Sequence, residues 1–192
     1  WSQTVSRCYY HRNIPDFLED TTSYILGKLT ENHGFSLEER QRNSWIKQIT
    51  LLKEWLKNLS GSILFEYSIP RMGKRIDCVI ITGSVVFTIE FKVGATSYEN
   101  QAVVQVTDYA LDLKNFHEQS HKPSIVPILI CTEAQDTVCS VDFYPDGISK
   151  TVFTNGQSLP GIISDACDKS SGTEIDVNTW INSVYKPTPT II

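Results

Sequence analysis

Three residues on two neighbouring segments could hold a metal ion and act on a phosphate group. Asp77 lies in the apolar run 75–81, and Glu90 and Lys92 lie two residues apart in the run 85–93. Two carboxylates can share a divalent cation with oxygen ligands, and a nearby ammonium can hold the attacking water or stabilise charge on phosphate. An aspartate, a spacer of a dozen residues and then Glu-x-Lys could therefore support metal-assisted chemistry on phosphate.

Both runs have the composition of buried strands, because β-branched and aromatic residues fill them. Side chains alternate between the two faces of a strand, so Glu90 and Lys92 project together while Phe87, Ile89 and Phe91 pack on the opposite side. A Glu-x-Lys pair also occurs on surface strands as an ordinary charge pair. The pair alone leaves both interpretations open.

Hydrophobic periodicity predicts the elements that must position these residues. In chain order the pattern predicts a helix over 38–59, strands over 63–69, 75–81 and 85–93, a helix over 98–117 and a strand over 125–131. The three consecutive strands have connections of hairpin length, which indicates an antiparallel meander, and the helical crossover makes the last strand parallel to its neighbour. We expect an α/β fold, α-β-β-β-α-β, with a central mixed sheet flanked by helices.

Three further polar residues lie on the helices that flank the expected sheet. Gln105 and Tyr109 are four residues apart in the second helix, so they share a face. Gln48 lies on the buried stripe of the first helix with Trp45 and Leu52. A buried polar side chain needs a partner, so Gln48 either bonds to backbone or faces a site.

A third acid, Glu66, lies on the first strand, where it is expected to point the opposite way from Phe65 and Tyr67. A salt bridge to Arg75 or Lys74 is the favoured role for this side chain. Direct metal ligation is the alternative.

Composition limits how this chain could bind nucleic acid. The chain has 192 residues, 41% of them hydrophobic and 20% charged, and its formal net charge of −5 gives no global attraction for a polyanion. A nucleic-acid site must then be a local patch, and Arg71, Lys74 and Arg75 form the densest basic group near the expected strands. A solvated turn is the alternative interpretation of this group.

The sequence also bears on the cellular compartment. Five cysteines are scattered without a C-x-x-C pair, so neither a zinc knuckle nor a disulfide framework is indicated; they are Cys8, Cys78, Cys131, Cys139 and Cys167. The chain shows no signal peptide and no apolar run long enough to span a bilayer. We expect a cytoplasmic protein with reduced cysteines and no membrane contact.

A competing motif runs from His117 to His121, which matches H-E-x-x-H. Two histidines at i and i+4 on a helix can bind zinc, with the glutamate, here Glu118, as general base. Pro123 argues that the helix is ending there, and a third zinc ligand is hard to supply. A structural use of both histidines, as cations at the helix C-terminus, is favoured over a zinc protease.

The order of these motifs resembles the core of the PD-(D/E)XK nuclease superfamily, and Gln105-x-x-x-Tyr109 resembles the extra motif of its RecB-type members. The resemblance implies a restriction-endonuclease-like fold. It also implies that Asp77 and Glu90 bind Mg²⁺ or Mn²⁺ and that Lys92 is the catalytic lysine. Gln105 and Tyr109 would position Lys92 or the substrate phosphate.

Wider stretches, 65–77, 89–94 and 108–114, are similar to the N-terminal domain of bacterial proteins in which a Schlafen-like or helicase-like P-loop ATPase follows. The resemblance divides the chain into an N-terminal helical extension (1–35), a nuclease-like core (36–135) and a C-terminal extension (136–192) leading toward that ATPase domain. The chain itself contains no G-x-x-x-x-G-K-[ST].

One departure from the superfamily pattern leaves two functions open. Members often carry another acid on the helix before the meander, where this chain has Gln48, with Glu38 and Glu39 nearer the helix start. Either Glu38 or Glu39 acts as this further acid, or Glu66 takes its place, or the metal site is weakened. The chain is then either a metal-dependent nuclease acting on DNA or RNA, or an inactive nucleic-acid-binding or regulatory module. The sequence sets no oligomeric state.

Overall fold

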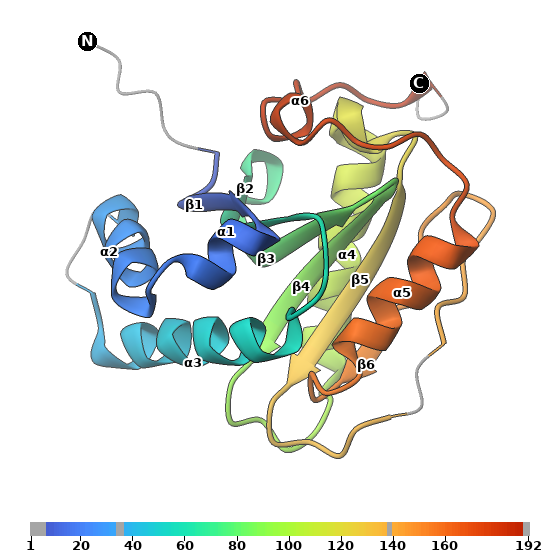
Figure 1. Ribbon diagram of the computed structural model, residues 1–192. Coiled ribbons are helices and arrows are strands. Elements are labelled where there is room, and N and C mark those ends of the chain that lie inside the picture. The colour runs from blue at the N-terminus through green and yellow to red at the C-terminus, as the bar shows by residue number, and fades with distance from the viewer. Residues whose placement is uncertain (1–6, 34–36, 138–139, 190–192) are drawn as a thin grey trace, which may run out of the picture.

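The computed structural model describes residues 7–33, 37–137 and 140–189, which form a mixed sheet covered by helices (Figure 1). The sheet has six strands in the order β1-β2-β3-β4-β5-β6. They are β1 (Tyr10–Asn13), β2 (Ser62–Ile69), β3 (Lys74–Thr82), β4 (Val85–Lys92), β5 (Ser124–Cys131) and β6 (Val152–Thr154). Neighbours from β1 to β4 pair antiparallel, whereas β4 with β5 and β5 with β6 pair parallel.

The helices follow the strands in the expected order. They are α1 (Ile14–Glu19), α2 (Thr22–His33), α3 (Glu39–Trp55), α4 (Asn100–Phe116), α5 (Leu159–Lys169) and α6 (Val177–Ile181), with 3₁₀ helices η1 (Pro70–Met72) and η2 (Glu118–Ser120). The sequence α3, β2, β3, β4, α4, β5 confirms the α/β class and the meander with its parallel fourth strand. The finer assignment to a restriction-endonuclease-like fold stays a prediction. α3 ends earlier than expected, and Asn58 beyond it has a left-handed backbone with φ 67°.

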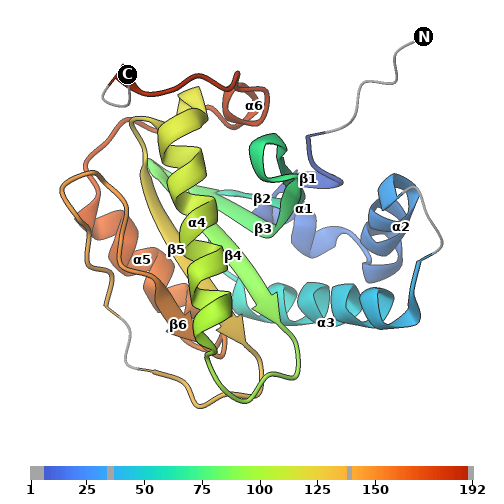
Figure 2. The same ribbon diagram turned by 180° about the vertical axis from the view of Figure 1, so that it is seen from behind.

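Helices cover both faces of the sheet, with α4 on the face opposite α5 (Figure 2). One cluster of buried side chains joins α1, α2, α3 and α5 to the sheet, and Phe87, Ile89 and Phe91 of β4 belong to it. The other face packs against α4, through Tyr109 and Leu113 among others. The alternation predicted for β4 is therefore confirmed. By the same alternation, the side chains of Glu90 and Lys92 project from the sheet face that α4 covers.

Segments outside the expected core add the two edge strands. β1 pairs with β2, and β6 pairs with β5. The N-terminal segment therefore contributes a strand as well as the helices expected there. Both edge strands share the sheet with the core, so the described residues of all three expected segments contribute to one hydrophobic core.

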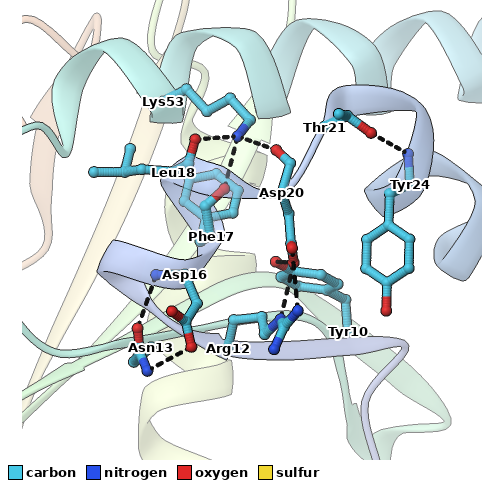
Figure 3. Close-up of polar contacts among 10 residues, drawn as sticks. All are labelled: Tyr10, Arg12, Asn13, Asp16, Phe17, Leu18, Asp20, Thr21, Tyr24 and Lys53. Atoms are coloured by element: carbon cyan, nitrogen blue, oxygen red, sulfur yellow. Dashed lines mark hydrogen bonds and ion pairs between the residues drawn. The ribbon is translucent and has the colours of Figure 1, made fainter.

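A lysine from α3 fixes the end of α1 (Figure 3). The ammonium of Lys53 donates hydrogen bonds to the main-chain oxygens of Phe17 (2.6 Å), Leu18 (3.2 Å) and Asp20 (2.5 Å). The last carbonyls of a helix have no hydrogen-bond donors within the helix, and the Lys53 ammonium is their donor here. The Asp20 carboxylate in turn accepts hydrogen bonds from Tyr10 and Arg12. These contacts tie the N-terminal segment to α3, whose other half lines the site described below.

Two findings bear on the expected compartment. No helix within the described ranges is long and apolar enough to cross a membrane. Within the described residues Cys78, Cys131 and Cys167 form no disulfide, and Cys139 lies outside the described residues.

Candidate functional site

An open cleft of about 1140 Å³ lies between the first half of α3 and the end of β4. Asp77 of β3 and Glu90 and Lys92 of β4 line it together. The opposite wall comes from α3 and the residues just before it, and the segment after β4 closes one end. The structure thus brings the three predicted catalytic residues to one place that solvent can reach.

Asp77 is held by the strand next to its own. The paired register of β3 and β4 runs from Thr82 opposite Val85 to Cys78 opposite Ile89, so Asp77 lies one residue beyond it. There the main-chain N–H of Phe91 donates a hydrogen bond of 2.9 Å to Oδ2 of Asp77. A side-chain carboxylate thus takes the place of a backbone acceptor at the point where pairing stops. This contact fixes the carboxylate beside Glu90.

Glu66 lies where the alternation of β2 breaks. Phe65 packs in the cluster under α3, whereas Tyr67 packs in the cluster under α4, so these two residues do not share a face as the sequence predicted. The change of face coincides with Glu66, whose φ of 56° is uncommon for a residue other than glycine. The Glu66 carboxylate accepts a hydrogen bond of 3.1 Å from the indole nitrogen of Trp45 on α3. The acid is therefore turned toward α3.

The partner of Glu66 also differs from the expected one. Nη1 of Arg75 donates a hydrogen bond of 2.7 Å to the main-chain oxygen of Glu66, and the Arg75 guanidinium lies 4.3 Å from the centre of the Tyr9 ring. Among the described residues, neither Arg75 nor Lys74 forms a salt bridge with the Glu66 carboxylate. The positive charge of Arg75 still acts on the Glu66 carboxylate and opposes the rise of its pKa. Trp45 is the hydrogen-bond partner of the side chain.

The carboxylates of this site repel one another in a poorly solvated place. Glu90 is 7% exposed. Burial, followed by the negative charge of Asp77, raises its pKa well above the usual range. Burial also raises the pKa of Asp77, against the hydrogen bond from Phe91 and the charge of Lys92. Burial and the charge of Asp77 raise the pKa of Glu66 to about 7. Such a group of acids attracts cations or protons.

The donor set fits Mg²⁺ or Mn²⁺. Oε1 of Glu90 lies 3.8 Å from Nζ of Lys92, whereas the buried Oε2 has no hydrogen-bond partner among the described residues. Within those same residues no three His, Cys, Asp or Glu side chains are arranged to hold a metal. Mg²⁺ is commonly held by one or two carboxylates, with waters and substrate phosphates as its other ligands. Asp77 and Glu90 supply that pair, and among the described residues that line the cleft there is no histidine or cysteine for zinc.

Gln105 and Tyr109 lie on the α4 side of Lys92. Nε2 of Gln105 donates a hydrogen bond of 2.7 Å to the Tyr109 hydroxyl, so the two residues share a face as predicted. Burial, followed by the charge of Glu90, raises the pKa of Tyr109 to about 12. Gln105 lines a second cavity that Lys92 also lines. Neither residue is among those that line the acidic cleft, so the pair is linked to it through Lys92 and through the charge of Glu90 that acts on Tyr109.

The buried stripe of α3 brings an amide, Gln48, to the cleft. Gln48 is 4% exposed, lines the cleft, and donates a hydrogen bond of 3.2 Å to Oγ of Ser44. Glu38 and Glu39 line the cleft at the exposed start of α3. Glu66 is half-buried, and its charge contributes to the raised pKa of Glu90. Of the acids left open by the sequence, Glu66 is the one with this electrostatic effect on the pair.

Apart from Lys92, the basic residues of the cleft are not those expected from the sequence. Arg71, Lys74 and Arg75 do not line it. Arg71 instead pairs with Asp112 of α4 at 3.2 Å and lies 3.5 Å from the centre of the Phe116 ring, so a nucleic-acid role for this group stays a prediction. Arg40 and Lys47 of α3 line the cleft. Their spacing of seven residues, which places both on one helix face, was the signal that sequence reasoning missed.

The H-E-x-x-H motif does not form a helical zinc site. α4 ends at Phe116, and His117 follows with an extended backbone. His117 is fully buried, with Nε2 2.9 Å from the Tyr67 hydroxyl and Nδ1 2.7 Å from Oγ of Ser120. Burial lowers its pKa to about 3. Both ring nitrogens are engaged, so this histidine has a structural role, but its lowered pKa leaves it neutral and not the cation expected at the helix C-terminus.

No family model, curated protein or solved structure matches this chain. The resemblance to the PD-(D/E)XK superfamily therefore depends on the motif residues themselves and stays a prediction.

Proposed function

We propose that the cleft binds Mg²⁺ or Mn²⁺ through Asp77 and Glu90 and hydrolyses phosphodiester bonds of DNA or RNA. The observation that carries the proposal is the meeting of Asp77, Glu90 and Lys92 in one open cleft. A buried oxygen of Glu90 without a donor among the described residues adds support, because such an oxygen is a ready ligand for a hard cation.

Each of the three side chains has a distinct task in this proposal. Asp77 is oriented by the Phe91 N–H and presents its remaining lone pairs to the cleft. The Lys92 side chain is 41% exposed, so its ammonium can donate hydrogen bonds to a phosphate oxygen while it stays beside Glu90. When bound, the ion would lower the pKa of a coordinated water and offset negative charge on the phosphate. Glu90 can accept a hydrogen bond from that water.

The basic residues of α3 account for how a polyanion could approach an acidic site. Arg40 and Lys47 lie on the wall that faces Asp77 and Glu90. Cations that line a cleft raise the local concentration of an anionic substrate even where the whole chain is negative. We therefore assign phosphate contacts outside the reacting group to Arg40 and Lys47.

One observation favours a second candidate, a module that binds nucleic acid without cutting it. Gln48 places a neutral amide at the position where the resemblance leads us to expect an acid. An amide oxygen is a weaker ligand than a carboxylate because it carries no net charge. A site with fewer acids would hold the ion less tightly, so nucleic acid could bind without being hydrolysed.

A cleavage assay separates the two candidates. Purified protein is incubated with end-labelled DNA and RNA, each single- and double-stranded, in Mg²⁺, in Mn²⁺ and in EDTA. We expect products only with metal, and a loss on the order of a hundredfold or more in Asp77→Asn. Asp142→Asn, an exposed aspartate outside the cleft, is the matched control and should cleave like wild type.

Calorimetric titration of Mn²⁺ tests the ion site independently of cleavage. We expect weak binding by wild type and by His117→Ala, and none by Asp77→Ala. Loss of binding in the histidine variant alone would refute the proposed site. Binding of nucleic acid with no product under any metal condition would leave the second candidate.

A further inference from the structure

A second cavity, of about 460 Å³, lies on the other side of Lys92 from the acidic cleft. The segment between β4 and α4 and the first two turns of α4 form it, with Cys131 of β5 at its edge. Sites for small ligands are concave and have volumes of roughly 300–1,000 Å³. The cavity therefore has room for one small molecular unit.

The cavity and the cleft share a wall. Lys92, Gly94 and Ala95 line both of them. The main chain of this wall is anchored to the start of the segment after β5, because Gly94 N–H donates to Oγ1 of Thr132 (2.8 Å) and Thr132 N–H donates to the Lys92 oxygen (3.3 Å). A nucleic-acid strand with one phosphate at Lys92 would place its adjacent nucleotide in the cavity.

The lining of the cavity differs in chemistry from that of the cleft. Thr96, Ser97, Gln101 and Gln105 offer neutral hydroxyls and amides, which both donate and accept hydrogen bonds. Among the described residues that line the cavity, Glu99 carries the only carboxylate, and it makes no capping bond to α4 there. A carboxylate repels phosphate but accepts hydrogen bonds from amino and hydroxyl groups. This lining suits an uncharged nucleoside better than a phosphate.

We propose that this cavity binds the base and sugar of one unpaired nucleotide adjacent to the phosphate held at Lys92, so that the substrate is single-stranded at this position. The inference rests on the proposed function of the cleft. A base can enter a concave pocket only when it is unstacked and unpaired, which an unpaired strand allows at little cost and a duplex does not. Hydrogen bonds to its edges then replace those it made to water.

Binding measurements in EDTA test this subsite without any bond being broken. Fluorescence anisotropy compares three ligands: an ordinary single strand, a strand of equal length made only of abasic residues, and a duplex. Both deoxyribose and ribose strands are used. The variant is Thr96→Val/Gln101→Leu, which keeps side-chain size and removes hydrogen-bonding groups. Thr173→Val, in a separate cavity bordered by η2, makes the same threonine change elsewhere.

We expect wild type and Thr173→Val to bind the ordinary strand on the order of tenfold more tightly than the abasic strand or the duplex. The Thr96/Gln101 variant should bind the abasic strand as wild type does but lose that preference. Equal weakening toward all three ligands, no preference in wild type, or no binding of any strand would each overturn the subsite. Cleavage in Mg²⁺ is a separate readout, so a strand preference without cleavage would contradict only the proposed hydrolysis.

Discussion

Replacing Glu66 by glutamine is expected to stabilise the metal-free protein at neutral pH. The carboxylate is buried beside Asp77, and Trp45 donates the hydrogen bond that it accepts. A glutamine oxygen can accept the same bond from Trp45, so the substitution removes the charge and keeps the partner. Functional sites commonly contain groups that help to bind a ligand but lower the stability of the ligand-free protein.

The size of the effect follows from the pKa of Glu66, which burial and Asp77 raise from 4.5 to about 7. Because the pKa of Glu66 is higher in the folded protein than in the unfolded chain, between these two pKa values the folded protein keeps Glu66 protonated while the unfolded chain has lost that proton. Stability is therefore highest below about pH 4.5 and falls as pH rises to about 7. Each pKa unit corresponds to about 1.4 kcal/mol, so the loss approaches about 3 kcal/mol above pH 7.

Urea unfolding in EDTA, followed by tryptophan fluorescence, measures this effect. Wild type and Glu66→Gln are compared from pH 4.5 to pH 8, because the difference between them cancels the titration of other groups. We expect Glu66→Gln to gain about 3 kcal/mol relative to wild type across this range. Glu54→Gln, on the exposed side of α3, serves as the control and should show no such gain. A difference that is constant with pH, or that shrinks as pH rises, would refute the reasoning.

Three further substitutions test the fold around the site. His117 has a pKa lowered to about 3, so wild type should lose about 2 kcal/mol as pH falls from 6.5 to 5, and His117→Gln should not show this slope in urea unfolding. Gly156→Ala would place a Cβ 2.0 Å from a Trp55 ring carbon at φ +106°, so thermal unfolding should show a loss of about 3 kcal/mol or more. Gly161→Ala, with nothing within 4 Å, should be neutral or stabilising by up to about 1 kcal/mol. Lys53→Met removes the donor for three carbonyls at the end of α1 and should cost about 1–3 kcal/mol in urea unfolding, whereas the exposed Lys57→Met should change stability little.

Local periodicity in the sequence was enough to predict much of the fold. The alternation of β4 placed Glu90 and Lys92 together on one face, and the structure has Phe87, Ile89 and Phe91 on the other. The order of helices and strands and the parallel pairing of β4 with β5 also followed from the pattern. These features depend on the period of a single element or on the length of a connection, both of which are visible in the sequence.

Contacts between distant segments decided the rest of the site. The left-handed backbone at Glu66 turns its side chain toward Trp45, 21 residues away, and no periodicity in β2 shows this. The placement of Arg40 and Lys47 at the cleft likewise depends on how α3 packs on the sheet, and the periodicity of β3 does not show that its pairing with β4 stops before Asp77. A strand pattern assumes regular alternation, so it fails where packing against another element rotates the chain. In this protein that point lies at the acids of the candidate site.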